Sequence, residues 1–122
     1  MSKPIVIERT VIDQGVNKRY HFYWCYGCDS LHFVAINPDK NTIGAGWDFS
    51  GTLENPIYSP SQLIRYEYGP AEERKTHICH TFIKDGMIQY LGDCTHEFRN
   101  QTIPMSPLPD WFLKQSEKTA EN

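Results

Sequence analysis

The sequence lacks the charge pattern of a nucleic-acid-binding protein and the apolar runs of a membrane protein. Its 12 Lys and Arg residues are outnumbered by 15 Asp and Glu residues, the net charge is −3, and no stretch forms a basic stripe. Because non-specific binding to phosphates needs clustered cations, nucleic acid is not an expected partner. No segment approaches the roughly 18 apolar residues of a membrane helix, so no membrane contact is expected. A protein or a small molecule is the expected partner.

An export signal is also missing from the first residues. The apolar run Ile5–Ile7 is three residues long and charged residues follow it at once, whereas a signal peptide has an apolar stretch of about 7–15 residues. We therefore expect a cytoplasmic protein. Disulfides are disfavoured in that reducing compartment, which favours a metal site for the four cysteines over a disulfide or unrelated free thiols.

The length and composition predict one small domain. A chain of 122 residues can bury one modest core, and 13% aromatic residues favour strands over a helical bundle. We expect a mainly β fold: a small antiparallel β-sheet or sandwich, stapled by a structural zinc site and followed by a short C-terminal helix. Residues 1–118 are expected to form this zinc-binding domain, and residues 119–122 a frayed tail.

Runs of β-branched and aromatic residues, bounded by turn residues, predict the strands. They predict strands at 4–12, 18–25, 31–36 and 62–68, and a long loop over 37–62 with one short strand around 47–49. Asp85-Gly86 between two apolar runs predicts a tight hairpin within residues 76–91. A short helix is expected over 110–118, with Asp110 as its cap.

The hairpin predicts that two distant cysteines meet. If Asp85-Gly86 is a two-residue turn, Lys84 pairs with Met87. Counting back along both strands places Cys79 and Cys94 on the same face, at the open end of the hairpin. This pair can supply half of a metal site.

The other half is the Cys25-x-x-Cys28 pair, in which Gly27 permits a tight turn because glycine tolerates positive φ. Two such halves predict a closed structural Zn²⁺ site with four thiolates. The expected ligands are Cys25, Cys28, Cys79 and Cys94.

Alternatives to this ligand set stay open. His96 follows Cys94 by two residues and could replace it as the fourth ligand, and His32 could do so less easily. A redox Cys-x-x-Cys pair lies at a helix N-terminus, whereas the residues after Cys28 read as a strand. The redox interpretation is therefore disfavoured.

Three polar residues near the predicted metal site are candidates for acid–base chemistry. His80 follows Cys79 directly, so on a regular strand it points to the opposite face, which it shares with Asp93. His80, Asp93 and His96 could line a catalytic polar site, or each could only bond to a loop backbone. Four thiolates leave no open position for catalytic zinc, and the motif order differs from the zinc-deaminase pattern. These observations favour a non-enzyme and leave the question open.

The long loop carries a candidate binding surface. It combines aromatic side chains with hydroxyls, although the aromatics could equally cap the core. No G-x-S-x-G sequence surrounds its serines, so no nucleophile is assigned. The residues of this surface are Trp47, Phe49, Tyr58, Ser59 and Ser61.

Residues 22–104 resemble a family of small phage and prophage proteins of unknown function, some of which are labelled as ammonia monooxygenases. Four motifs carry the resemblance: W-x-F-x-G at 47–51, P-x-x-S-P-S at 56–61, C-H-x-F-I-x-D-G-x-I at 79–88 and L-x-D-C-T-H at 91–96. The resemblance implies a phage or prophage source, with the host cytoplasm as the location, and it supplies no activity.

Together these observations predict a zinc-stabilised phage accessory protein that acts as a protein-interaction module and modulates or inhibits a host protein. The expected partner is a host or phage protein, and the sequence indicates no oligomeric state. The alternative function is a small zinc-containing hydrolase or ligand-binding enzyme that uses His80, Asp93 and His96.

Overall fold

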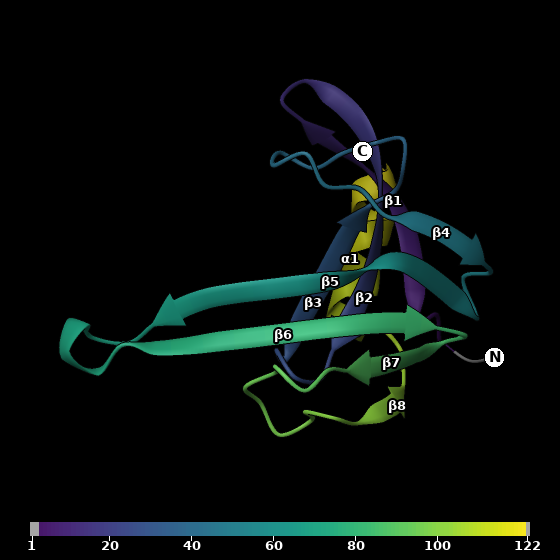
Figure 1. Ribbon diagram of the computed structural model, residues 1–122. Helices are drawn as coiled ribbons and strands as arrows, with labels where there is room; N and C mark the ends of the chain where they lie inside the picture. The colour runs from purple at the N-terminus through teal and green to yellow at the C-terminus, as the bar shows by residue number, and fades with distance from the viewer. Residues whose placement is uncertain (1–2, 122) are drawn as a thin grey trace.

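Two antiparallel sheets and one C-terminal helix make up the structure (Figure 1). A computed structural model describes residues 3–121, with side chains for residues 3–115. The first sheet consists of β1 (Val6–Asp13), β2 (Val16–Cys25) and β3 (Ser30–Ala35). The second consists of β4 (Asp48–Gly51), β5 (Pro56–Tyr68), β6 (Lys75–Lys84), β7 (Met87–Tyr90) and β8 (Thr102–Pro104). The predicted mainly β class is confirmed.

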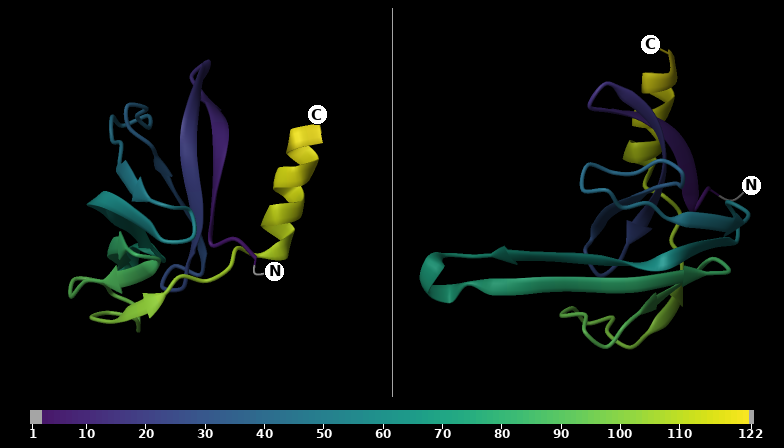
Figure 2. Two further views of the ribbon diagram at one scale, coloured as in Figure 1. Left: turned by 90° about the vertical axis from the view of Figure 1, so that its right-hand side faces the viewer. Right: turned by 45° about the horizontal axis from the view of Figure 1, so that its top comes forward.

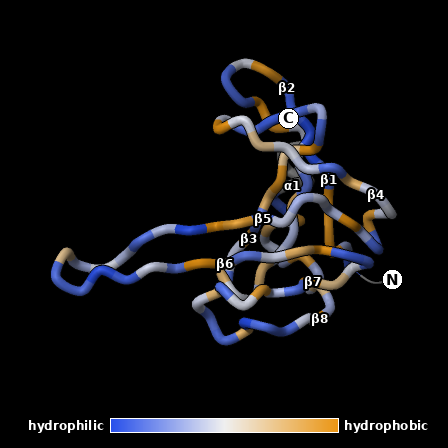
Figure 3. The backbone as a smooth tube through the Cα atoms, viewed as in Figure 1, coloured by the Kyte–Doolittle hydropathy of each residue, from blue (hydrophilic) through white to orange (hydrophobic). Residues whose placement is uncertain are grey.

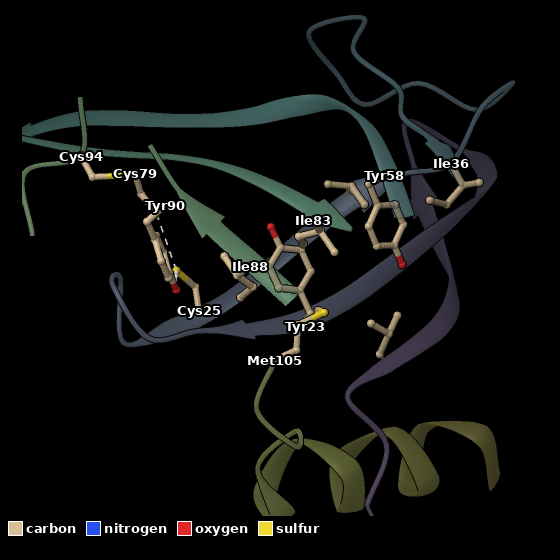
Figure 4. Close-up of a cluster of buried hydrophobic side chains, with 12 residues drawn as sticks. Tyr23, Cys25, Ile36, Tyr58, Cys79, Ile83, Ile88, Tyr90, Cys94 and Met105 are labelled. Carbon is tan, nitrogen blue, oxygen red and sulfur yellow. Dashed lines mark hydrogen bonds between the residues drawn. The ribbon is translucent and has the colours of Figure 1, made fainter. Parts of the chain in front are cut away.

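The core lies where the two sheets meet (Figure 4). Alternation of side chains along each strand turns one face of each sheet inward. Tyr23 from β2 and Ile88 from β7, for example, are each at most 1% exposed. Two cysteines, Cys25 and Cys79, are buried in this core from opposite sheets. Any group that they bind therefore joins the two sheets.

The hairpin of β6 and β7 has the predicted register. Lys84 pairs with Met87, and Thr81 pairs with Tyr90. Asp85 and Gly86 in the turn have φ values of 54° and 76°, as a two-residue turn of this type requires. The chain leaves the ladder after Tyr90, where the residues that follow form a loop against the outer edge of β6.

The long loop predicted over residues 37–62 is wrong in its second half. β5 begins at Pro56 and continues without a break to Tyr68. Proline is tolerated at the first residue of a strand and at bulges; Pro56 occupies the first position, and Pro60 lies where the pairing register with β6 shifts. The sequence analysis also missed β8, which is three residues long.

β5 and β6 extend together beyond the body of the molecule as an arm, residues 63–78, tipped by a 3₁₀ turn at Ala71–Glu73 (Figures 1 and 2). Every residue from Arg65 to Lys75 is exposed. Hydrophilic residues dominate the outer part of the arm, and apolar ones lie nearer its root (Figure 3).

The C-terminal helix α1 (Asp110–Glu121) begins at the predicted residue. Its Phe112 packs on Phe22 of β2 with 5.4 Å between ring centroids. Across residues 3–121, no helix has the length and apolar character needed to cross a membrane. Asn122, part of the predicted frayed tail, lies outside the described residues.

Candidate active site and metal centre

Ser61, His80 and Asp93 form one chain of hydrogen bonds on one face of the second sheet. Ser61 Oγ lies 2.9 Å from His80 Nε2. On the other side of the ring, His80 Nδ1 lies 2.9 Å from Asp93 Oδ2 and 3.2 Å from Oδ1. The distances fit a serine nucleophile, a histidine base and an aspartate that orients the base.

Three elements position this triad. Ser61 comes from β5, His80 from β6, and Asp93 from the loop after β7. That loop is fixed to the outer edge of β6, because Leu91 donates its N–H to the carbonyl of His80 at 2.9 Å. The carbonyl of Ser61 accepts a bond from Trp47 Nε1 at 3.3 Å. The triad is thus held by main-chain contacts on both strands.

The hydrogen bonds fix the tautomer of His80. A carboxylate accepts only, so Nδ1 carries the hydrogen that is donated to Asp93. Nε2 then has a free lone pair and accepts the hydroxyl hydrogen of Ser61. The His80 side chain is 25% exposed and that of Asp93 51%, so the triad is open to solvent and to a substrate.

A second cluster lies on the opposite face of the same strand pair. The ligand atoms of Cys25, Cys28, His32 and Cys79 all lie within 4.8 Å of one another, a grouping that could hold a metal ion. The sulfurs of Cys25 and Cys79 are 3.7 Å apart. Zn–S bonds of about 2.3 Å in a tetrahedron place two sulfurs about 3.8 Å apart, which fits this separation.

The hydrogen bonds around His32 also favour a metal. The Tyr23 hydroxyl donates to Gln62 Oε1, so it accepts from His32 Nδ1, which lies 3.2 Å away. The hydrogen of the ring is thereby on Nδ1. The other nitrogen, Nε2, is buried and has no hydrogen-bond partner among the described residues. A buried lone pair without a partner is costly, and a metal ion would satisfy it.

The thiols perturb one another strongly. Hydrogen bonds from Cys28 and Cys79 lower the pKa of Cys25 well below its usual range. The bond to Cys25 in turn raises the pKa of Cys28 to about 12, and that of Cys79 also rises. Like charges this close cannot all ionise unaided. A dication removes this conflict, because it binds each cysteine as a thiolate.

Cys79 also belongs to a second group, with Cys94 and His96. Its sulfur lies 3.4 Å from His96 Nε2. Cys94 Sγ accepts a hydrogen bond from the backbone N–H of His80 at 3.3 Å. The predicted meeting of Cys79 and Cys94 is thus present in the structure, while His32 joins the group around Cys25 and Cys28. The assignment of Cys94 as the fourth ligand stays a prediction.

His96 lies away from His80 and Asp93. Its ring contacts Tyr90, with 4.9 Å between centroids, and its Nε2 lies beside Cys79. Its pKa is lowered by burial. Of the three polar candidates, the structure brings His80 and Asp93 together and places His96 with the cysteines.

Gly27 is needed for space rather than for positive φ. It is absent from the glycines with positive φ, and a Cβ at this position would lie 2.2 Å from His96 Nε2. The reason given from sequence for this glycine is therefore wrong. The His96 ring packs directly on the Cys25-x-x-Cys28 turn.

The predicted binding surface divides between the core and the triad. Tyr58 is 5% exposed, and its hydroxyl bonds to His21 Nδ1 at 2.5 Å. Trp47 and Phe49 pack against the same core as partly buried side chains. Ser59 is exposed, and Ser61 contacts His80.

Sequence reasoning placed Ser61 on a surface and did not recognise it as a nucleophile. Ser61 was missed because the first half of β5 was not predicted as a strand. Had residues 56–61 been assigned to a strand paired with β6, alternation would have put Ser61 on the face of His80. His32 was undervalued because its tautomer is set through Tyr23 by Gln62, which lies 39 residues from Tyr23 in the sequence.

A family model described as "Bacterial ubiquitination-like system serine protease (BubE)" matches residues 3–91, a span that includes Ser61 and His80. No curated protein and no solved structure matches the chain. The description names a bacterial system, so the phage or prophage source stays a prediction. Since the match covers well over half of the 122 residues, the chain belongs to the BubE family of bacterial ubiquitination-like system serine proteases.

Proposed function

We propose that this protein is a zinc-stabilised serine protease that works on a protein of a bacterial ubiquitination-like system. The observation that carries the proposal is the chain of hydrogen bonds from Ser61 Oγ through His80 to Asp93. The family description supports peptide bonds as the target. This is the enzymatic alternative of the sequence analysis, with Ser61 in place of His96 as its third residue.

In the proposed reaction Ser61 Oγ attacks the carbonyl carbon of the scissile peptide bond while His80 Nε2 takes the hydroxyl proton. The C–N bond then breaks, and His80 gives that proton to the leaving amine. Water, activated by the same nitrogen, attacks the acyl ester and releases the second product and Ser61. Asp93 holds the ring in the required tautomer and stabilises its cationic form.

The proposed ligands of Zn²⁺ are Cys25, Cys28, Cys79 and His32. The partnerless Nε2 of His32 and the short distances between the sulfurs support this set. With four protein ligands the metal is a structural link and takes no part in bond cleavage. It joins the first sheet, which carries Cys25 and His32 and has Cys28 in its β2–β3 turn, to β6, which carries Cys79 and His80.

The accessory role, in which the chain binds and modulates a host or phage protein, stays a prediction, as does the cytoplasmic location. A protease needs a protein partner as its substrate, so a binding role and the proposed reaction are compatible. The two roles differ in one respect: only the protease requires Ser61 to act as a nucleophile.

The test is labelling with a small fluorophosphonate, which phosphonylates activated serines with loss of fluoride, followed by mass spectrometry of the labelled peptide. We expect one adduct, on Ser61. Asp93→Asn should slow labelling on the order of 10⁴-fold, as loss of the orienting carboxylate does in other triads. Ser59→Ala is the matched control and should label normally, because Ser59 is exposed and bonds to neither His80 nor Asp93. An unlabelled Ser61 in folded protein refutes the proposal.

A further inference from the structure

The outer edge of β5 in the arm is an unpaired strand edge that leads to Ser61. β4 pairs with β5 only at Pro56–Ser59, and β6 occupies the other side as far as Tyr68. Past Ser59, no strand in residues 3–121 lies against the outer side of β5. A free edge of this kind can bind an extended peptide as an additional strand.

The directions of the backbone groups follow from the contacts of β6. The carbonyl of His80 accepts from Leu91, and both backbone groups of Ile78 bond to Thr95. These groups thus point away from β5. In an antiparallel ladder, facing residues exchange both hydrogen bonds or neither. Leu63 faces His80 and Arg65 faces Ile78, so the N–H and C=O groups of Leu63 and Arg65 point to the outer edge.

The same alternation holds at Ser61, whose outward carbonyl is the one that accepts from Trp47 Nε1. For the backbone groups of Leu63 and Arg65 no partner is present among the described residues. The outward groups thus begin two residues from the nucleophile, about 7 Å along the strand. A strand added at this edge would end beside Ser61, where the Trp47 side chain already takes the outward carbonyl.

The side chains of the arm favour a partner that is recognised by its backbone N–H and C=O groups rather than by its side chains. The arm carries equal numbers of basic and acidic residues, so it has no net charge to select an acidic or basic peptide. The exposed Leu63, at 55%, offers an apolar contact on the face of the triad. In strand addition, main-chain hydrogen bonds supply most of the affinity.

We propose that the substrate binds as an extended segment that adds a strand to the outer edge of β5 at Leu63 and Arg65, and so presents its scissile bond to Ser61. This inference rests on the proposed function, and it defines the substrate class: a polypeptide with a flexible, extended segment at the cleavage site. A globular surface without such a segment cannot form this ladder.

The test compares two sets of serine-directed probes. One is a pool of Ala-Ala-Ala-Xaa diphenyl phosphonates, and the other is the pool of acetyl-Xaa phosphonates without the peptide. We expect the peptide to speed labelling of Ser61 about tenfold, the effect of one or two hydrogen bonds. The ratio of the two rates is the readout, so changes in the reactivity of Ser61 itself cancel.

Arg65→Pro removes the outward N–H and leaves the ladder to β6 intact, because proline is tolerated on edge strands when its nitrogen faces outward. It should abolish the acceleration, whereas Arg65→Ala keeps the N–H and should retain it. An acceleration that is absent from the wild type, or that survives in Arg65→Pro, overturns the inference. Failure of the fluorophosphonate to label Ser61 instead overturns the proposed function.

Hydrogen exchange in the wild type gives a second measurement that does not depend on a variant. The amides of Leu63 and Arg65 should exchange fast in the free protein and slow down once the peptidyl phosphonate is attached. The small fluorophosphonate should leave them fast. Equal exchange after both labels, or slow exchange in the free protein because two copies pair through this edge, contradicts the inference.

Discussion

The sulfur of Cys94 accepts a hydrogen bond from the backbone N–H of His80 at 3.3 Å. A cysteine predicted as a metal ligand thereby contacts the main chain of the proposed catalytic base. Two roles are consistent with this position: a ligand that completes the zinc site, or a contact that holds His80. The structure groups Cys94 with Cys79 and His96, while His32 joins Cys25 and Cys28.

The two roles predict different metal coordination. We expect X-ray absorption of the zinc-loaded protein to show three sulfur ligands and one nitrogen, with His32 as the nitrogen donor. Cys94→Ala should retain one zinc per chain and slow labelling of Ser61, since His80 loses a contact. Four sulfur ligands in the spectrum, or loss of zinc from Cys94→Ala in native mass spectrometry, would restore Cys94 as the fourth ligand.

Removal of the metal should destabilise the whole domain. Structural zinc contributes roughly 10–16 kcal/mol in small peptides, whereas a domain has a net stability of about 5–15 kcal/mol. We expect a strong chelator to unfold the protein or to lower its unfolding temperature sharply, as measured by circular dichroism. A Cys25→Ser variant, already deficient in metal, is the control and should respond little. Identical melting of wild type with and without chelator would contradict a structural metal.

Gly27→Ala should be destabilising because the new methyl group collides with His96. A separation of 2.2 Å between the added Cβ and His96 Nε2 is far inside van der Waals distance, and overpacking of this kind costs about 1–3 kcal/mol. Urea denaturation measures the change in the free energy of unfolding. His96→Ala makes room for the methyl group, so the cost of Gly27→Ala should shrink in that background. Equal costs in both backgrounds would show that His96 is not the obstacle.

Acid should weaken the protein through the buried His21. Burial lowers its pKa from the ordinary 6.5, and hydrogen bonds from Arg19 and His21 lower the pKa of Glu8. The unfolded chain therefore binds protons more readily than the folded one. Stability should fall as the pH drops below about 6.5 on account of His21, and further below about 4.5 on account of Glu8.

The measurement is the free energy of unfolding in urea between pH 7 and pH 5. His21→Gln keeps a polar side chain beside Tyr58 and removes the titrating ring, so its loss of stability over this range should be smaller. Loss of metal in acid affects both proteins alike. Parallel curves would exclude His21 as a source of the acid sensitivity.

Local patterns predicted the parts of the fold that depend on neighbours in the sequence. Asp85-Gly86 gave the correct turn and register, and Asp110 marked the start of the helix. The bulged start of β5 was not predicted because Pro56 and Pro60 resemble loop residues, although proline is tolerated at the first residue of a strand and at a bulge. β8 has three residues and is stabilised by its pairing to β7 rather than by its own pattern.

The sequence predicts the residues of the candidate sites only where strand alternation determines which face of the sheet a side chain occupies. The opposite directions of Cys79 and His80 follow from it, whereas Asp93 reaches His80 from the loop after β7. The role of Ser61 depended on a strand that was not predicted. The role of His32 depends on hydrogen bonds to Tyr23 and, through it, Gln62, which only the folded chain brings together.

Because side chains alternate along β6, the metal site and the triad both depend on the register of this one strand. Cys79 and His80 are adjacent, and they face opposite sides of one ladder. Inserting or deleting a single residue before them would turn the sulfur toward Ser61 and the imidazole toward the cysteines. Such a change would lose the metal and the triad in one step, whereas a two-residue change keeps the parity. An added residue should therefore be accepted in the exposed turn at the tip of the arm, which can lengthen without moving β6, but not within β6 between that turn and Cys79.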